Sequence, residues 1–427
     1  MSSFGIPTSG FEPAESSEKL EEERLWGSEP SDYYPVKLGD IYNNRYKVRG
    51  KLGYGGSSTI WLASDIKENR FVVLKVFALS RRGAKREPNF FSTLDEVEKT
   101  YKIEGPGGVY IRRPLDQFSI TWNDPGKPPQ IGTRKWTHPV LVFKPLGPSI
   151  GTLFRQRLIT DQRGMTPEDV KLIIRHTLSV LDYLHTANFI HGEVHEDNLL
   201  LPFSYTGIPG FVLDEGDNPT RSKVIDKIRT VYESHSTQIA SDVLPPTLCG
   251  FSNALSVSKN AKIPAVQFTG EEHSWSPQVI LGIPWGKKND IWQLGCMTWY
   301  LFEGHRLFHE GTVIGWKPSE LCSRQLALMI AVLGKPSIEY LKKGQRTKDY
   351  FDSDWKWTGY RESDDGMPAS ATNSHKIPKT SLKAQARRLS KGTKRKEVYL
   401  DFIQKCLQWE EKDRWSAKQL LGHPWLE

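Results

Sequence analysis

The sequence predicts an α+β protein of two structural units, the first built around an antiparallel sheet and the second mainly helical. Three observations support this. Apolar and polar residues alternate from Arg45, in RYKVRGKLGYGGSSTIWLASD. An apolar run with one lysine follows, FVVLKVFAL at 71–79. From about residue 150, apolar residues recur with the period of a helix. At 427 residues the chain can form two or three such units.

Residues 41–147 form the predicted first unit. After the two strand segments, FSTLDEVEKTYKI at 91–103 places Leu94, Val97 and Tyr101 on one face of a helix. HPVLVFKPLG at 138–147 then indicates a further strand that ends in Pro and Gly. The unit is therefore expected to be mostly β with one helix.

Residues 148–427 form the predicted second unit. Thr166 is expected to cap a long helix with Pro167 at its first position. Its buried stripe comprises Val170, Ile174, Leu178, Leu181 and Leu184. This helix leads into FIHGEVHEDNLLLP at 189–202. NDIWQLGCMTWYLFEG at 289–304 and the last thirty or so residues, where Ser416 caps a helix, predict further helical regions.

Three segments fall outside these patterns. Residues 1–40 have little periodicity and, with an acidic stretch at 12–29, are expected to form an extended arm. Segments 203–247 and 362–397 are expected to be loop inserts. The stretch HKIPKTSLKAQARRLSKGTKRKE at 375–397 contributes strongly to the formal net charge of +8. It is interpreted as a solvated, partly disordered loop, with a nuclear-localisation or anionic docking role as the alternative.

Composition excludes several classes of protein. No uncharged apolar run approaches the roughly 20 residues needed to cross a bilayer. The N-terminus lacks the basic and apolar regions of a signal peptide, and its acidity argues against a mitochondrial presequence. The expected location is the cytoplasm, the nucleus or both. The four cysteines form no C-x-x-C pair, so they are expected to be reduced thiols rather than zinc ligands.

The order of motifs resembles the protein-kinase fold: a glycine-rich turn, a strand lysine, a helix with an acidic residue, a loop with His and Asn, and SPQVILGIPWGKKNDIW. Finer details, such as the lead-in at 33–63 and LQWEEKDRWSAKQLLGHPWL, resemble the SR-protein kinase family in its filamentous-fungal form, over residues 33–427. The resemblance implies a bilobal fold, ATP bound between the lobes, Mg²⁺, and an Arg-Ser-rich protein as substrate or partner.

The resemblance also assigns a nucleotide site. Gly53 and Gly55 would let the backbone approach the phosphates, with Ser58 where a third glycine is usual. Lys75 would bind the α and β phosphates, held by an ion pair with Glu96. Taken alone, the glycines fit a simple hairpin turn and the lysine a solvated edge strand. The remaining expected contacts are Leu52, Ile60, Phe143 and Lys144, the last where the family has a glutamate.

The loop at 189–202 departs from the family pattern at the residues that accept a proton or neutralise charge during phosphoryl transfer. Glu193 replaces the catalytic aspartate, and a base displaced by about 1 Å can cost a hundredfold in rate. His195 replaces the lysine that neutralises the transferred phosphoryl group. Gly192 stands where these kinases have a threonine. Asn198 remains as a metal ligand.

A second departure lies in LCGFSNA at 248–254. Gly250 stands at the position of the metal-binding aspartate, Phe251 is kept, and Ser252 replaces the glycine. Losing the main carboxylate ligand of Mg²⁺ weakens the step that depends most on electrostatics. Asp214 is the rival candidate for that carboxylate, although no Phe-Gly follows it.

Other kinase positions are retained. His191 and Phe251 match apolar packing positions, and Asp290 is expected to brace the catalytic-loop backbone. Arg414 normally pairs with a glutamate, which is Gln278 here, so we expect Gln278 or water to satisfy the arginine.

The sequence therefore favours a nucleotide-sensing or partner-binding pseudokinase with weak or absent phosphotransfer. The alternative is an active Ser/Thr kinase with Glu193 as base and Asn198 plus an unrecognised carboxylate holding Mg²⁺. A third interpretation, a basic RNA-associated adaptor, depends only on residues 375–397. We expect a monomer without direct nucleic-acid binding.

Overall fold

The computed structural model describes residues 13–15, 17–25, 32–79, 83–122, 136–160, 164–202, 219–226, 229–235, 243–257, 262–264, 272–309, 318–359, 376–390 and 392–427. The chain forms two compact units. The first comprises Met1–Glu96, Arg112–Pro148 and Leu200–Ser252, and the second Val97–Ile111, Ser149–Leu199 and Asn253–Glu427. The sequence had placed the insert at 203–247 with the second unit, whereas its described residues belong to the first.

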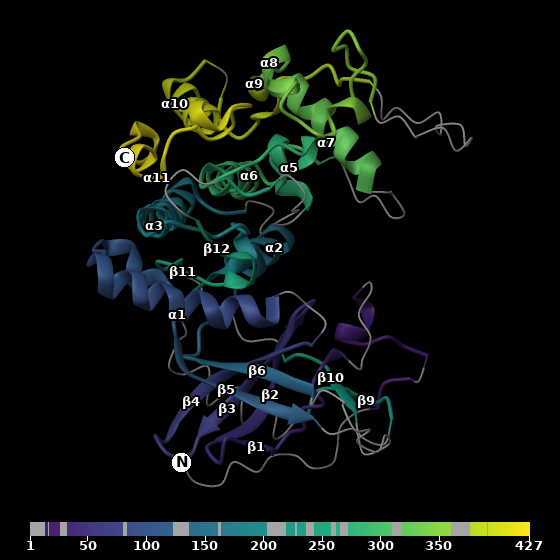
Figure 1. The fold of residues 1–427 in the computed structure, drawn as a ribbon, viewed down its shortest axis with the longest axis vertical. Coiled ribbons are helices and arrows are strands. Elements are labelled where there is room, and N and C mark those ends of the chain that lie inside the picture. The colour runs from purple at the N-terminus through teal and green to yellow at the C-terminus, as the bar shows by residue number, and fades with distance from the viewer. Residues whose placement is uncertain are drawn as a thin grey trace. The chain divides into compact units, whose positions relative to one another are not determined.

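A six-stranded antiparallel sheet forms the first unit, with strand order β1-β2-β3-β4-β6-β5 (Figure 1). The strands are β1 (Ile41–Tyr42), β2 (Tyr46–Gly55), β3 (Ser58–Asp65), β4 (Arg70–Phe77), β5 (Pro114–Trp122) and β6 (Trp136–Phe143). Lys75 on β4 is paired with Ile60 on β3 and with Leu141 on β6. The lysine therefore lies inside the sheet, and the edge-strand interpretation does not apply.

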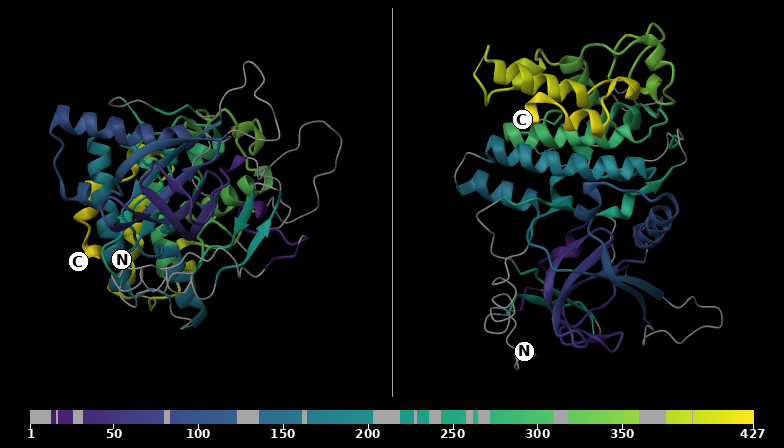
Figure 2. Two further views of the ribbon diagram at one scale, coloured as in Figure 1. Left: turned by 90° about the horizontal axis from the view of Figure 1, so that it is seen from below. Right: turned by 90° about the vertical axis from the view of Figure 1, so that its left-hand side faces the viewer.

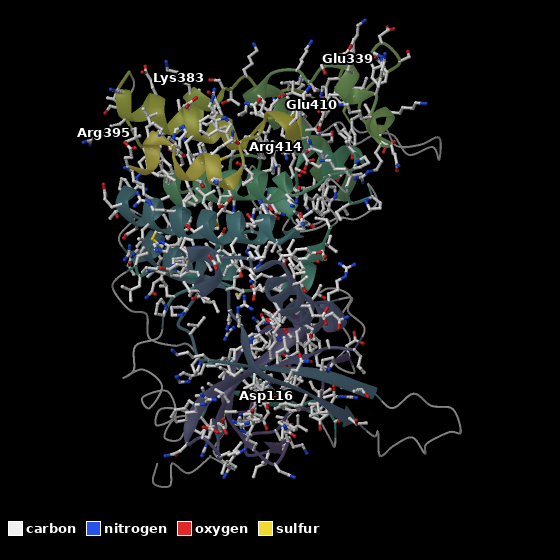
Figure 3. The ribbon with its side chains drawn as sticks, turned by 60° about the vertical axis from the view of Figure 1, so that its left-hand side comes forward. Asp116, Glu339, Lys383, Arg395, Glu410 and Arg414 are labelled. Atoms are coloured by element: carbon white, nitrogen blue, oxygen red, sulfur yellow. The ribbon has the colours of Figure 1, made fainter. Side chains whose placement is uncertain are left out.

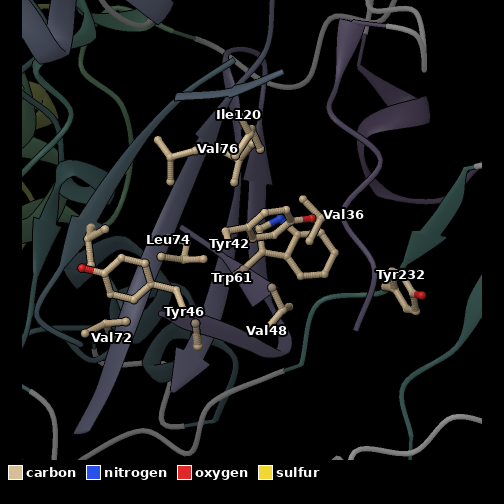
Figure 4. Close-up of a cluster of buried hydrophobic side chains, with 13 residues drawn as sticks. Val36, Tyr42, Tyr46, Val48, Trp61, Val72, Leu74, Val76, Ile120 and Tyr232 are labelled. Carbon is tan, nitrogen blue, oxygen red and sulfur yellow. The ribbon is translucent and has the colours of Figure 1, made fainter. Parts of the chain in front are cut away.

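The core of this sheet contains aromatic and β-branched side chains (Figure 4). The alternation read from the sequence explains it, because every second residue of a strand faces the same side. Val48, Val72 and Leu74 are completely buried. Tyr232, far along the chain, joins the cluster and meets Trp61 edge-on with ring centroids 5.8 Å apart. The insert thus contributes to the core of the first unit.

Helix α1 (Gly83–Tyr101) begins eight residues before the predicted segment. Its buried residues are Glu87, Phe90, Phe91 and Leu94, which follow the i, i+3, i+4, i+7 pattern of one helical face. The predicted stripe lies on the same side of the helix, but of its residues only Leu94 is fully buried, and Tyr101 is 71% exposed. Pro88 lies inside the helix, and because proline is unfavourable in a helix interior, the turns around it do not read as helical from the sequence.

The described residues of the acidic stretch, 13–15 and 17–25, pack against the described part of the insert. A short 3₁₀ helix, η1 (Glu21–Arg24), contacts β2 and the hairpin of β9 (Ser222–Val224) and β10 (Thr230–Tyr232). Glu22 forms an ion pair with Lys51 of β2, whose side chain is fully buried and also donates to the Tyr232 carbonyl at 2.9 Å. Acidic composition could not indicate this packing, because the partners lie 29 and about 200 residues away.

The second unit is helical, as predicted. It includes helices α2 (Ile150–Thr160), α3 (Pro167–Thr186), α5 (Pro277–Leu281) and α6 (Lys288–Glu303). Helix α3 leads into the loop at 189–202 and packs beside α6 (Figure 2). Thr166 caps α3, accepting from the Asp169 amide at 3.1 Å, and Pro167 is its first residue. All five residues of the predicted stripe are completely buried. The short strands β7 (Phe189–Ile190) and β12 (Leu255–Ser256) pair beside the loop.

The remaining α-helices of the described residues are α7 (Pro318–Leu333), α8 (Ile338–Leu341), α9 (Leu382–Gln385), α10 (Lys394–Cys406) and α11 (Ala417–Leu421), the last capped by Ser416 as predicted. The basic stretch is only partly solvated. Lys383 and Arg395, labelled in Figure 3, are exposed, but Lys396 is 2% exposed and donates to the Ala386 carbonyl. No helix among the described residues is long and apolar enough to span a bilayer.

Candidate functional site

The glycine-rich turn connects β2 to β3. Gly53 pairs with Ile60, and Gly55 with Ser58, across this hairpin. A Cβ added at either glycine would meet nothing within 4 Å, and neither residue has a positive φ. Neither packing nor backbone strain therefore requires glycine here. The open space above the backbone fits close approach by a ligand, as the phosphates of a nucleotide would make.

Lys75 forms its ion pair with Glu87, not with Glu96. The Lys75 Nζ lies 2.6 Å from the Glu87 Oε2, and Glu87 is 2% exposed. Glu96 is exposed on the same helix. Nine residues separate the two glutamates, which is about two and a half turns, so they point in opposite directions. The predicted partner was wrong, while the predicted ion pair to a helix glutamate is present.

The other expected nucleotide contacts also lie in the first unit. Leu52 and Ile60 are half-buried on β2 and β3, while Phe143 is buried at the end of β6. Lys144, the next residue, is exposed, so its side chain does not fill the interior. Arg112 places its guanidinium 4.6 Å from the centroid of the Phe143 ring. Burial lowers the pKa of this arginine.

Gly250 lies between β11 (Thr247–Leu248) and the 3₁₀ turn η5 (Phe251–Asn253). Its φ of +79° is in the left-handed region, which glycine adopts without strain. Phe251 is completely buried and stacks on Phe90 with ring centroids 4.4 Å apart. The Ser252 hydroxyl donates to Glu87 Oε2 at 2.6 Å. This segment is therefore fastened to α1.

In the second unit, α6 holds the backbone of the loop at 189–202. Asp290, completely buried, accepts from the amides of His191 at 2.9 Å and Gly192 at 2.8 Å. Gln293 accepts from the Val194 amide at 2.9 Å and donates to the Gly192 carbonyl at 3.0 Å. The predicted role of Asp290 is confirmed. His191 is also completely buried, as predicted.

Three candidate residues of this loop lie together. The Asn198 Nδ2 donates to the Glu193 carbonyl at 2.8 Å and lies 2.9 Å from His195 Nε2. The other ring nitrogen of His195 accepts from the Asp197 amide at 3.3 Å. His195 stands at the position of the family lysine, and both nitrogens of its ring are engaged within the loop, one by the Asn198 side chain and one by the Asp197 amide.

The two carboxylates that follow His195 are each paired with an arginine. Glu196, completely buried, forms a two-pronged ion pair with Arg306, whose guanidinium lies 3.5 Å from the centroid of the Tyr300 ring. Asp197 accepts from Arg155 at 2.7 and 3.0 Å. Burial alone would raise the pKa of Asp197, but hydrogen bonds from Arg155 and from a nearby serine outweigh it and lower the pKa.

Gly192 is required by the backbone. Its φ is +78°, and a Cβ would lie 2.9 Å from the Asn253 carbonyl oxygen. A threonine, the family residue at this position, would therefore clash with main-chain atoms that cannot move as a side chain can.

Arg414 is satisfied as predicted. It is 1% exposed, among the helices of the second unit (Figure 3), and donates to Gln278 Oε1 at 2.6 Å. Two carbonyls, those of Gln408 and Lys288, accept from the same guanidinium at 2.9 and 3.1 Å. Burial lowers the pKa of this arginine. A neutral amide and backbone oxygens replace the family's ion pair.

These residues fit ATP better than Mg²⁺. The open glycine turn and the Lys75–Glu87 pair could hold phosphates, and the backbone around Phe143 and Lys144 could hold the base. Mg²⁺ requires oxygen ligands, and Gly250 offers no side chain where the family has its carboxylate. The rival carboxylate, Asp214, lies outside the described residues.

Sequence reasoning missed Glu87 and the role of Ser252. The spacing of Glu87 from Phe90, Phe91 and Leu94 was the available signal for the first, since it continues their helical face. No sequence signal indicates that the Ser252 hydroxyl meets a carboxylate 165 residues earlier.

Comparison with known proteins agrees with this geometry. The protein kinase domain model matches residues 246–426. A serine/threonine protein kinase of Aspergillus fumigatus is 31% identical over 432 aligned positions, covering 98% of this chain and 94% of that protein. The serine/threonine-protein kinase SRPK of Physarum polycephalum is 27% identical, covering 92% of this chain and 88% of its own length.

SRSF protein kinase 3 of Mus musculus is 33% identical over 170 residues, which cover 40% of this chain and 27% of the mouse protein. Protein kinases generally use ATP and a divalent metal ion. The predicted α+β bilobal kinase fold is confirmed by the domain match and by a sheet unit followed by a helical unit. The chain belongs to the serine/threonine protein kinases, in their SRPK-like family.

Proposed function

We propose that this chain binds ATP through the glycine turn and Lys75, and that its phosphotransfer is weak or absent. The observation that carries the proposal is the combination of an assembled Lys75–Glu87 pair, at 2.6 Å, with Gly250 at the metal-binding position. The first retains affinity for phosphate oxygens. The second removes the carboxylate that would hold the metal against the same phosphates. The chain can therefore bind ATP without catalysing phosphoryl transfer efficiently.

The catalytic loop supports the second half of the proposal. Phosphoryl transfer depends on positioning and on neutralising charge as it develops. His195 replaces the family's lysine, and Glu193 is a base whose side chain is one methylene longer than that of aspartate. If the losses at Gly250 and His195 each cost about 3 kcal/mol, the rate falls by about four orders of magnitude, less where the two effects overlap.

The second candidate function is an active Ser/Thr kinase that uses Glu193 as its base. It is favoured by the intact hydrogen bonds that the loop amides donate to Asp290 and Gln293, which would hold the base in place. Its metal would be held by the Asn198 amide oxygen and an unrecognised carboxylate. On this proposal the substrates are Arg-Ser-rich proteins linked to splicing, the class that the resemblance to the SR-protein kinases implies.

For either function we propose a protein partner and a location in the cytoplasm, the nucleus or both. An Arg-rich substrate would bind to an acidic surface on this chain. The formal net charge of +8 on the chain opposes the binding of such a basic substrate, which is a further reason to place the active-kinase function second.

Two measurements test the proposal. Thermal unfolding with ATP is recorded in EDTA and in Mg²⁺ or Mn²⁺, and we expect stabilisation in both, by about 2.7 kcal/mol at a concentration one hundred times Kd. Transfer of labelled phosphate to an Arg-Ser repeat peptide is recorded beside the Glu193→Gln variant, which separates this chain's activity from a contaminating kinase. Strictly metal-dependent stabilisation, together with transfer that Glu193→Gln abolishes, would establish the active enzyme instead.

A further inference from the structure

The hydroxyl of Ser252 shares one carboxylate oxygen with the nucleotide-site lysine. Glu87 Oε2 accepts from Lys75 Nζ at 2.6 Å and from Ser252 Oγ at 2.6 Å. All three residues belong to the first unit. The Lys75 side chain is 12% exposed and the Glu87 side chain 2% exposed, so both charges are largely withdrawn from water. Hydrogen bonds to a buried carboxylate are strong, and an unmade one is costly.

An apolar contact fastens the same segment one turn further along α1. Phe251 stacks on Phe90 at 4.4 Å with an interplanar angle of 8°, and meets Phe91 edge-on at 5.4 Å. Phe251 and Ser252 are consecutive, and so are Phe90 and Phe91. The segment and the helix therefore meet at two adjacent points, one polar and one aromatic. This fixes the rotation of α1 that directs Glu87 toward Lys75.

Ser252 stands where the related kinases have glycine, which has no hydroxyl to donate. In this chain the residue two positions earlier, Gly250, offers no carboxylate to a metal. The segment therefore lacks the carboxylate that would hold a metal ion against the phosphates. It instead donates a hydrogen bond, from Ser252, to the carboxylate that positions Lys75.

We propose that Ser252 is a positioning residue, which holds Glu87, and through it Lys75, in the arrangement that binds nucleotide phosphates without a metal ion. The inference rests on the proposed nucleotide binding. The hydroxyl of Ser252, rather than the fold alone, then sets the affinity for ATP in the absence of a metal ion.

The first test measures the Kd of a fluorescent ATP analogue in EDTA. Ser252→Ala is expected to weaken binding by about tenfold or more, the effect of losing a hydrogen bond to a charged group. Ser256→Ala is the matched control, because Ser256 is exposed on β12 four residues later, and its Kd should equal that of the unaltered protein. Equal affinities for Ser252→Ala and the unaltered protein would overturn the proposal.

A double-mutant cycle with Glu87→Gln separates positioning from general destabilisation. If Ser252 acts through Glu87, its removal should add little once Glu87 is neutral, so the two effects on Kd should not be additive. A residue that only stabilises the fold would instead give fold-changes that multiply. Multiplying effects would therefore contradict the inference even if Ser252→Ala binds weakly.

Hydrogen exchange of the nucleotide-free protein distinguishes failure of this inference from failure of the proposed function. Ser252→Ala should increase exchange in both 249–253 and the first turns of α1, while Ser256→Ala leaves both unchanged. If the unaltered protein binds no nucleotide but this coupled increase is seen, the proposed function fails and the positioning contact stands. If nucleotide binds and no coupled increase is seen, the positioning role fails alone.

Discussion

Restoring the metal-binding carboxylate, by Gly250→Asp, should change stability and chemistry in opposite directions. Gly250 has a φ of +79°, a conformation that costs an ordinary L residue about 1–2 kcal/mol and Asp somewhat less. We therefore expect the free energy of unfolding of Gly250→Asp to be about 1 kcal/mol lower than that of the unaltered protein. Gly250→Asn is the matched control, because asparagine tolerates the same backbone conformation but carries no charge. Thermal or urea unfolding of the two variants should agree closely.

The chemical effect should separate them. A carboxylate at this position can hold Mg²⁺, and a metal that stabilises the transition state by about 3 kcal/mol raises the rate by roughly a hundredfold. Single-turnover transfer of labelled phosphate to an Arg-Ser peptide should therefore increase by about that factor in Gly250→Asp, and not in Gly250→Asn. If both variants transfer at the rate of the unaltered protein, residue 250 is not the missing metal ligand and the assignment of this segment is refuted.

Three further outcomes follow from the second unit. Gly192→Ala should lower the free energy of unfolding by about 2 kcal/mol or more in urea titrations, because a Cβ at φ +78° would meet the Asn253 carbonyl at 2.9 Å; a loss under 0.5 kcal/mol would contradict this. Gln278→Ala should cost about 3 kcal/mol, since it leaves the buried Arg414 guanidinium without its acceptor at 2.6 Å, and a loss below about 1 kcal/mol would show that water replaces the amide. Burial lowers the pKa of His273 to about 3, so the unfolded chain binds the extra proton below pH 6.5 and stability should fall with decreasing pH by up to about 1.4 kcal/mol per unit. His273→Phe should flatten this slope between pH 6.5 and 5 in urea titrations. An unchanged slope would show that His273 does not cause the pH dependence.

Local chemistry made the second unit the more predictable one. Thr166, Pro167 and the apolar stripe of α3 lie within one helix, and the capping bond at 3.1 Å is formed between residues three apart. Arg414 and Gln278 lie 136 residues apart, yet their pairing was also expected, because the motif order fixed which positions meet. Where a family pattern is retained, a substitution can be interpreted through its known partner position.

Prediction failed where partners are distant and the pattern is specific to this chain. Helix α1 was started too late because of Pro88, and the ion pair was then given to Glu96 on the opposite face. The acidic stretch was expected to be extended, whereas Glu22 pairs with Lys51, and Glu18 and Glu23 pair with Arg221 and Lys223 of the insert. Neither contact follows from propensity or periodicity, since both depend on tertiary packing that brings charges together.

The central claim is that the nucleotide site is assembled while the metal site is lost. Isothermal titration of the unaltered protein with ATP, in EDTA and again in excess Mg²⁺, tests it most directly. We expect binding in EDTA with a Kd that Mg²⁺ changes by less than about threefold, because Lys75 rather than a metal holds the phosphates. Binding seen only with Mg²⁺, or no binding under either condition, would contradict the claim.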